Sequence, residues 1–325
     1  MDIEKKGLRS RESLRNEMDF SVFCMFWNGI FPKSSTIYML IWAQCFCLTL
    51  PGCAVWLDAR GPLRAWIPRK GEEYGSVKPS NHRKWRPDLA VLPFAKVEGD
   101  RIKLYNLRDC QYRTEDDYDL KHLDSRFDLQ DMQTVDFVVV PFKDAPVLAH
   151  TMLSFGMSTG DQIVVSVEAR LEKGEKYTPM AGALKQYELM YILGTERDLI
   201  RLRTDVRKVD VFMYRAKANS TEVQALFLDI VKRINTLAKY PEFYDTLTNN
   251  CTTNLVRHVN SLRPGTIPAD LRILFPGYSD QLIGQLGLIE SDIEATAMRS
   301  RAAVLPTDGR RLESREYSQK IRSRY

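Results

Sequence analysis

The stretch LAHTMLSFGMSTGDQIVVSVEAR, residues 148–170, decides the fold class of this chain. Two runs rich in β-branched and apolar residues flank the turn sequence GMSTGD, a pattern that predicts a β-hairpin. Because side chains alternate between the faces of a strand, one face of this hairpin is apolar and His150 lies on the opposite face. If the turn centres near Thr159, His150 lies across from Glu168, with Cβ atoms about 4.5–5.5 Å apart. A register change of one residue would remove this pairing.

Strand and helix patterns on both sides of the hairpin predict an α+β domain. Residues 101–107, 134–141 and 209–215 have the composition of strands. Residues 220–237 repeat apolar side chains at helical spacing after a Ser-Thr-Glu cap signal. We therefore expect a domain over residues 85–295 built on an antiparallel sheet. A linker rich in Gly, Pro and charge (58–84) precedes it, and a basic tail (296–325) follows.

The overall composition excludes several classes of protein. Of the 325 residues, 44% are hydrophobic and 27% are charged, as in globular proteins. The net charge of +5 is mild, and the basic residues are interspersed with acids, so we predict no nucleic-acid binding. The chain has four His and lacks a CxxC pair, which argues against a structural zinc site. Nothing in the sequence indicates a metal or an organic cofactor.

An uncharged apolar stretch near the amino terminus predicts attachment to a membrane. Residues 36–57, TIYMLIWAQCFCLTLPGCAVWL, would reach about 33 Å as a helix, enough for the bilayer core. With Lys33 just before it, we favour a signal anchor that leaves residues 1–35 in the cytoplasm and the domain outside. Alternatively, LPGC at 50–53 resembles a lipobox, so that the signal is cleaved and Cys53 is lipidated. Initiation at Met25 would give a signal of more usual length.

A second segment, YDTLTNNCTTNLVRHVNSL at 244–262, supplies a candidate nucleophile. The cap residues before Cys251 predict that it lies in the first turn of a helix, where the macrodipole lowers a thiol pKa. Cys251 and His150 then form a possible nucleophile and base. The residues alone leave other interpretations open: a structural His150, an inert Cys251, and a Glu168 on a solvated face. His258 is about 10 Å along the same helix from Cys251, too far to serve as its base.

Several stretches together resemble one known family. They are WRPDLAVLPFAKVEGDRIKLYNLRDCQYR, AHTMLSFG, VVSVEARLEKGEKY, QYELMYILGTERDLIRLRT and YDTLTNNCTTNLVRHV, in this order over roughly residues 85–288. This part of the chain resembles the Lnb N-terminal periplasmic domain family, named for the bacterial lipoprotein intramolecular acyltransferase. The resemblance implies a papain-like, NlpC-type fold in circularly permuted order. It also implies a bacterial envelope protein, anchored in the inner membrane with its domain in the periplasm.

The resemblance also implies roles for individual residues. The family's His falls on His150 and its Cys on Cys251. Permuted relatives place a polar orienting residue on the strand after the His, where Glu168 is the candidate and Ser166 shares its face. Asn250 and the N–H groups at the helix start are expected to stabilise an oxyanion. The named acyltransferase has several membrane helices after this domain, whereas this chain has one apolar segment, before it.

The sequence leaves three functions open. The first is a thiol acyltransferase or hydrolase acting on a membrane lipid or lipoprotein, and the second is a cell-wall peptidase or amidase. The third is a non-catalytic envelope domain that binds lipid or lipoprotein, for which Arg201, Arg203 and Arg207 could bind a head group. An exposed Cys251 beside His150 would favour catalysis, and a buried Cys251 would favour binding. A disulfide between Cys110 and Cys251 would silence the nucleophile.

Overall fold

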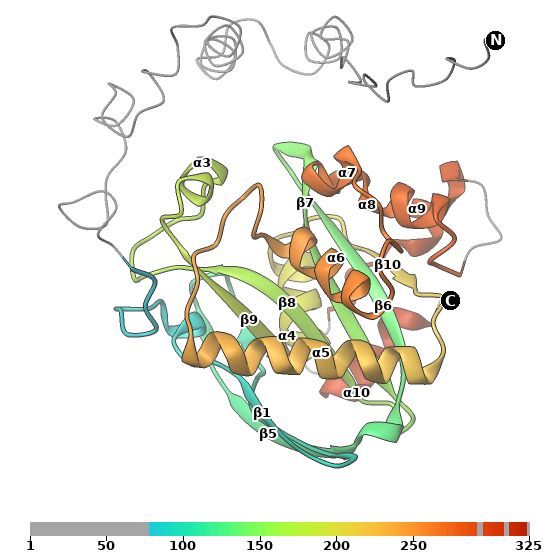
Figure 1. Cartoon of the computed structure of the whole chain (residues 1–325), viewed down its shortest axis with the longest axis horizontal. Coiled ribbons are helices and arrows are strands. Elements are labelled where there is room, and N and C mark those ends of the chain that lie inside the picture. The colour runs from blue at the N-terminus through green and yellow to red at the C-terminus, as the bar shows by residue number, and fades with distance from the viewer. Residues whose placement is uncertain (1–77, 291–294, 309–311, 324–325) are drawn as a thin grey trace, which may run out of the picture. The chain divides into compact units, whose positions relative to one another are not determined.

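A mixed sheet of eight strands forms the centre of the domain (Figure 1). The structure, a computed structural model, describes residues 78–290, 295–308 and 312–323. The strand order is β1-β2-β9-β8-β7-β6-β10, and β5 pairs with β2 beside this path. The strands are β1 (Phe94–Glu98), β2 (Arg101–Arg108), β5 (His122–Asp128), β6 (Met132–Phe142), β7 (Ala145–Met157), β8 (Gln162–Arg170), β9 (Glu188–Gly194) and β10 (Phe212–Arg215). A separate pair is formed by β3 (Gln111–Tyr112) and β4 (Tyr118–Asp119).

The predicted α+β class and the predicted strands are confirmed, but the sheet is not wholly antiparallel. The segments predicted as strands coincide with β2, β6 and β10, and the central hairpin is β7–β8. The exception is the bridge between Arg108 of β2 and Gly194 of β9, which is parallel. Between these two strands the chain forms β5, which pairs with β2, and the antiparallel run β6–β7–β8, so no hairpin connects β2 directly to β9.

The helices lie on both faces of the sheet (Figure 1). The long helix α5 (Ser220–Lys239) and α6 (Cys251–Leu262) cover one face, and α4 (Glu196–Arg201) and α10 (Ser314–Arg322) lie on the other. The apolar stripe predicted for residues 220–237 faces the sheet, and Phe227 packs edge-on against Phe155 of β7. The remaining helices are α3 (Pro179–Ala183), α7 (Leu271–Leu274), α8 (Ser279–Gln285) and α9 (Ala295–Ala302). Short helical turns occur at η3 (Pro87–Leu89), η4 (Leu129–Asp131), η5 (Leu202–Val206) and η6 (Pro276–Tyr278).

The segment predicted as a basic tail packs on the domain instead. It contains α10 and most of α9, and Tyr317 and Ile321 of α10 are buried in the main core. Arg322 forms ion pairs with Glu196, at 2.5 Å, and with Asp136, at 2.7 Å. Burial of these two apolar side chains and pairing of the charge stabilise a segment whose composition resembles that of a tail.

The end of the predicted linker is also attached to the domain. The Asn81 amide donates to the backbone carbonyls of Leu237 and Ala238, both at 3.0 Å. Arg83 pairs with the buried Glu188 at 2.5 Å. The apolar stretch 36–57 and most of the linker lie outside the described residues. Among the residues that are described, no helix is long and apolar enough to cross a bilayer.

Candidate active site

The hairpin register brings His150 and Glu168 to one place. The paired residues of β7 and β8 run from Gly156 with Gln162 to Met152 with Ser166. Two residues further along each strand, the same register places His150 opposite Glu168, as the sequence predicts. His150, Ser166 and Glu168 share a face of the hairpin because each strand alternates.

One ring nitrogen of His150 is held by both polar residues of β8. His150 Nε2 lies 2.7 Å from Ser166 Oγ and 3.2 Å from Glu168 Oε1. Ser166 Oγ donates to Glu168 Oε1 at 2.7 Å, so it accepts from the imidazole. Nε2 therefore carries a proton, and Nδ1 is the nitrogen left for the thiol. Glu168 and Ser166 act together in orienting the ring, where the sequence offered them as alternatives.

A π-helical turn positions the counter-charge of Glu168. Arg203 lies in η5, a π-helix that directly follows α4, and its guanidinium donates to Glu168 Oε1 at 3.2 Å. Burial alone would raise the pKa of Glu168, but His150 and Arg203 together lower the pKa well below its usual range. Glu168 therefore stays charged beside the imidazole.

Cys251 begins α6 and lies against β7. It is the first residue of the helix, after the N-cap Asn250, and it is 6% exposed. Its Sγ lies 3.9 Å from the Ala149 carbonyl oxygen and 3.8 Å from Thr252 Oγ1. The hydroxyls of Thr151 and Thr252 are 3.1 Å apart, which joins the helix start to the strand that carries His150.

Cys251 and His150 shift each other's pKa. Burial would raise the pKa of the Cys251 thiol, but its hydrogen bond to His150 and the charge of the imidazole lower that pKa to about 7. Burial would lower the pKa of His150, but Glu168 and Cys251 raise it to about 9. Between these values both groups are charged, as a thiolate and an imidazolium. This arrangement is typical of cysteine nucleophiles activated by a neighbouring His.

Asn250 caps the helix that begins with Cys251. Its side-chain oxygen accepts from the Thr253 N–H at 2.9 Å, and its amide donates to the Thr246 carbonyl at 2.5 Å. Both ends of the side chain are thus used in capping α6 and in fixing the loop before it. The amide nitrogen carries a second N–H, so the role of this side chain at an oxyanion stays a prediction. Asn250 positions Cys251 by fixing where the helix begins.

The family model of the Lnb N-terminal periplasmic domain matches residues 118–277, which include His150, Glu168 and Cys251. This domain belongs to that family. No curated protein and no solved structure gives a significant match. Membership of a periplasmic domain family supports a location in the bacterial cell envelope.

Two residues contact this site in ways that the sequence alone does not predict. Arg203 was a candidate head-group ligand, but it is buried and donates to Leu199 O at 2.7 Å as well as to Glu168. The sequence feature that could have indicated its pairing with Glu168 is the position of this Arg among apolar residues inside a helical segment. The alternation of β7 places Thr151 on the apolar face of the hairpin, yet its N–H and hydroxyl both help to lower the pKa of Cys251. The sequence feature that could have indicated this contact is a polar Thr151 among the apolar residues of that face.

The other candidate residues lie in different settings. Arg201 donates to Tyr112 O at 3.1 Å and Arg207 pairs with Glu115 at 3.0 Å, so both have protein partners. His258 contacts the Tyr191 hydroxyl at 2.8 Å and Asp229 at 2.7 Å, which makes it part of a buried structural network.

Cys110 does not pair with Cys251. Both are free thiols, and burial raises the pKa of Cys110, the opposite of what happens at Cys251. Across the described residues, no cluster of three His, Cys, Asp or Glu side chains is arranged to hold a metal ion.

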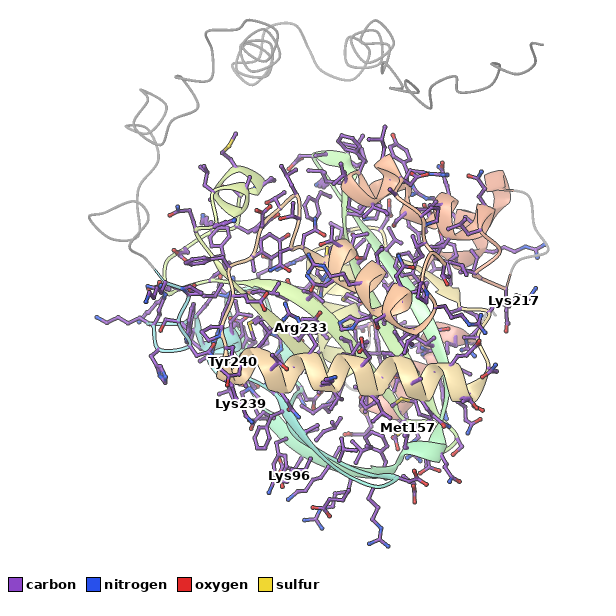
Figure 2. The ribbon with its side chains drawn as sticks, viewed as in Figure 1. Lys96, Met157, Lys217, Arg233, Lys239 and Tyr240 are labelled. Carbon is purple, nitrogen blue, oxygen red and sulfur yellow. The ribbon has the colours of Figure 1, made fainter. Side chains whose placement is uncertain are left out.

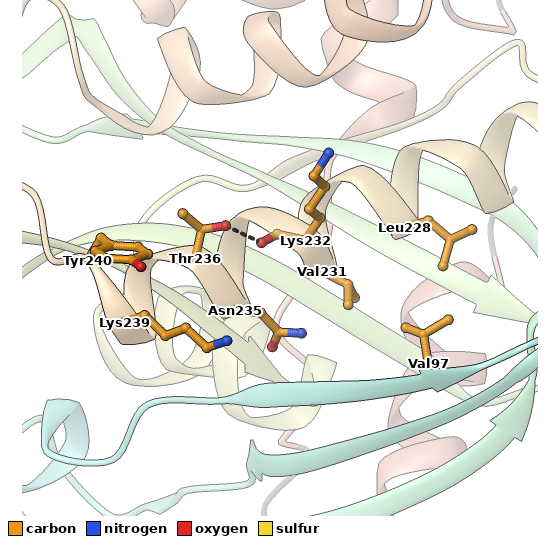
Figure 3. A pocket seen from close by; sticks show the side chains of 8 residues that line it. All are labelled: Val97, Leu228, Val231, Lys232, Asn235, Thr236, Lys239 and Tyr240. Atoms are coloured by element: carbon orange, nitrogen blue, oxygen red, sulfur yellow. Dashed lines mark hydrogen bonds between the residues drawn. The ribbon is translucent and has the colours of Figure 1, made fainter.

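A shallow groove on the domain is separate from this site. It lies between α5 and β1 and has a volume of about 490 Å³ (Figure 3). Its lining consists of Val97, Leu228, Val231, Lys232, Asn235, Thr236, Lys239 and Tyr240. Figure 2 shows Lys239 and Tyr240 at the end of α5, with Lys96 on the neighbouring strand. Neither Cys251 nor His150 lines the groove.

Proposed function

We propose that this envelope protein is a membrane-tethered thiol enzyme that transfers or hydrolyses an acyl group through Cys251 and His150. The observation that supports this most is the mutual perturbation of the two groups. His150, held at Nε2 by Ser166 and Glu168, lowers the pKa of the buried Cys251 thiol at the start of α6 to about 7, and pKa values perturbed in this way are concentrated at functional sites. The papain-like arrangement implied by the family resemblance is part of the same proposal.

The first step is acylation of the enzyme. The Cys251 thiolate attacks the carbonyl carbon of an ester or amide, and a C–S bond forms while the C–O or C–N bond breaks. The imidazolium of His150 gives its proton to the leaving oxygen or nitrogen. Glu168 and Ser166 keep the ring in the orientation that this proton transfer needs, since both hold Nε2.

The second step releases the acyl group. The neutral imidazole takes a proton from an amine or a water molecule, which attacks the thioester carbonyl. The C–S bond breaks, and the thiolate and imidazolium are restored. An amine acceptor makes the protein an acyltransferase, and water makes it a hydrolase.

Backbone N–H groups are the proposed oxyanion donors. The first turn of a helix leaves N–H groups without intrahelical acceptors, and at α6 the Asn250 side chain caps that of Thr253. The N–H of Cys251 belongs to the same residue as the attacking sulfur, three covalent bonds away from it. We assign it to the oxyanion, together with the second N–H of the Asn250 amide.

The low exposure of Cys251 favours a second candidate, the non-catalytic domain that binds lipid or lipoprotein. A thiol that is 6% exposed meets a substrate only through a narrow approach or after local rearrangement. The two candidate functions differ in whether Cys251 turns over a substrate.

The test uses the full chain in detergent micelles with a long-chain p-nitrophenyl ester, with and without an amine acceptor. We expect nitrophenol release by the wild type, and loss of that release in Cys251→Ser and in His150→Gln. Cys110→Ser is the matched control, since Cys110 is also a buried free thiol but lies in another cluster. Cleavage of cell-wall peptides with no ester turnover would select the peptidase. No turnover of either substrate by folded protein would select the binding domain.

A further inference from the structure

Large apolar side chains are exposed on two sides of the candidate active site. Met180 of α3 and Leu247 of the loop before α6 form one group, which we name the α3 rim. Leu271 and Leu274 of α7 and Tyr278 of η6 form the other, the α7 rim. These five side chains are between 37% and 59% exposed.

The α3 rim is attached directly to the start of the catalytic helix. Thr246 Oγ1 donates to Pro179 O at 2.7 Å, which joins the loop to α3. The Asn250 amide donates to Thr246 O at 2.5 Å, which joins the same loop to the residue before Cys251. Leu247 and Met180 thus lie on two segments fixed to each other and to the nucleophile.

The α7 rim is attached to the strand that carries His150. Gly277, beside Tyr278, packs so closely on β7 that an added Cβ would lie 2.0 Å from the Pro146 carbonyl oxygen. Pro146 lies four residues before His150 on the same strand. Figure 1 shows α3 and α7 at the same end of the domain, with the start of α6 between them.

The chain outside the described domain indicates what covers these rims. The uncharged stretch 36–57 is long enough to span a bilayer, and the domain described above begins at residue 78. The intervening 20 residues reach at most about 70 Å when fully extended. A domain tethered so closely meets the bilayer at a high effective concentration, so a small apolar surface suffices for contact.

We infer that the α3 and α7 rims rest on the phospholipid bilayer, so that Cys251 takes an acyl substrate directly from the membrane surface. Apolar side chains on both sides of a recessed thiol exclude water from the approach while keeping the substrate's chains in lipid. The inference rests on the proposed function for its chemistry and adds the surface of the domain that contacts the bilayer.

The test is photo-crosslinking of the full chain in liposomes that contain a phospholipid with a diazirine on its acyl chain. The two variants are Leu271→Asp with Leu274→Asp on the α7 rim, and Val97→Asp with Leu123→Asp as the matched control. The control residues are exposed to a similar degree but lie on β1 and β5, at the opposite end of the domain (Figure 1). Adducts are located by peptide mass spectrometry.

We expect wild-type adducts on peptides of residues 178–183, 245–249 and 270–278. The yield of these adducts should be about tenfold lower in the rim variant, because two charged side chains replace apolar ones at the lipid contact. The control variant should keep them. Adducts distributed equally over β1 and β5, or lost equally in both variants, would overturn the inference. Alkylation of Cys251 by a small water-soluble reagent, measured in the same samples, tests the proposed function separately from bilayer contact.

Discussion

Replacing His150 with Ala should convert Cys251 from an activated thiol into an ordinary buried one. In the wild type, His150 lowers the pKa of Cys251 from 9.0 to about 7 despite burial. Without the imidazole, burial is the largest remaining influence, and the pKa returns to 9 or above. The substitution therefore raises the pKa of Cys251, because it removes the imidazole that lowers this pKa and leaves the burial that raises it.

The size of the effect depends on two factors that partly cancel. At pH 7, a thiol of pKa 7 is half ionised, whereas one of pKa 9 is about 1% ionised, roughly a 50-fold difference. The more basic thiolate is also the better nucleophile, by about six- to tenfold over this range. The alkylation rate at pH 7 should therefore fall by about fivefold or more. The midpoint of the pH–rate profile is the clearer readout, since it moves from about 7 to 9 or above.

The assay is alkylation of the full chain with iodoacetamide from pH 5 to 10, followed by quantification of the Cys251 peptide. Cys110 is the internal control, because burial raises its pKa and His150 does not reach it. His150→Gln is the second variant, since it keeps a polar group beside Ser166, and thermal unfolding establishes that both variants fold. A wild-type midpoint near 9, or a midpoint that stays near 7 without His150, would refute the reasoning.

Three further predictions concern the support of the site. Glu168→Gln should lower the pKa of His150, because it removes the charge that offsets burial, and the imidazole should then titrate below pH 9 by NMR; an unchanged titration would contradict this role. Thr151→Val should raise the alkylation midpoint of Cys251 by less than His150→Ala does, whereas Thr151→Ser should preserve it, and equal effects of both would exclude a role for the hydroxyl. Gly277→Ala should destabilise the domain by about 1–3 kcal/mol, because the new Cβ meets a β7 carbonyl at 2.0 Å; an unchanged Tm would contradict that packing.

The sequence predicted the hairpin well because two local signals agree there. Period-2 alternation and the GMSTGD turn determine the same register, and that register alone places Glu168 across from His150. Cys251 was predicted at a helix start from its cap residues, and the structure has it there. These features depend on neighbours in the chain, which a single sequence shows directly.

Other features depend on contacts between distant segments, which local patterns do not show. The sequence predicts that Asn250 donates to an oxyanion, and the structure shows that its side-chain oxygen also caps the helix. Arg203 has the sequence context of a surface cation, and only the fold shows that it donates to Glu168 of β8. Likewise, Tyr317 lies in a basic segment whose packing on α4 is visible only in three dimensions.

The most direct test of the central claim is capture of the acyl-enzyme. The full chain is incubated with a long-chain p-nitrophenyl ester, quenched in acid and analysed by mass spectrometry. The account predicts one acyl group on the Cys251 peptide, removable by neutral hydroxylamine, present in Cys110→Ser and absent in Cys251→Ser. Acylation of another residue, or no thioester on a Cys251 that still alkylates with a midpoint near pH 7, would contradict it.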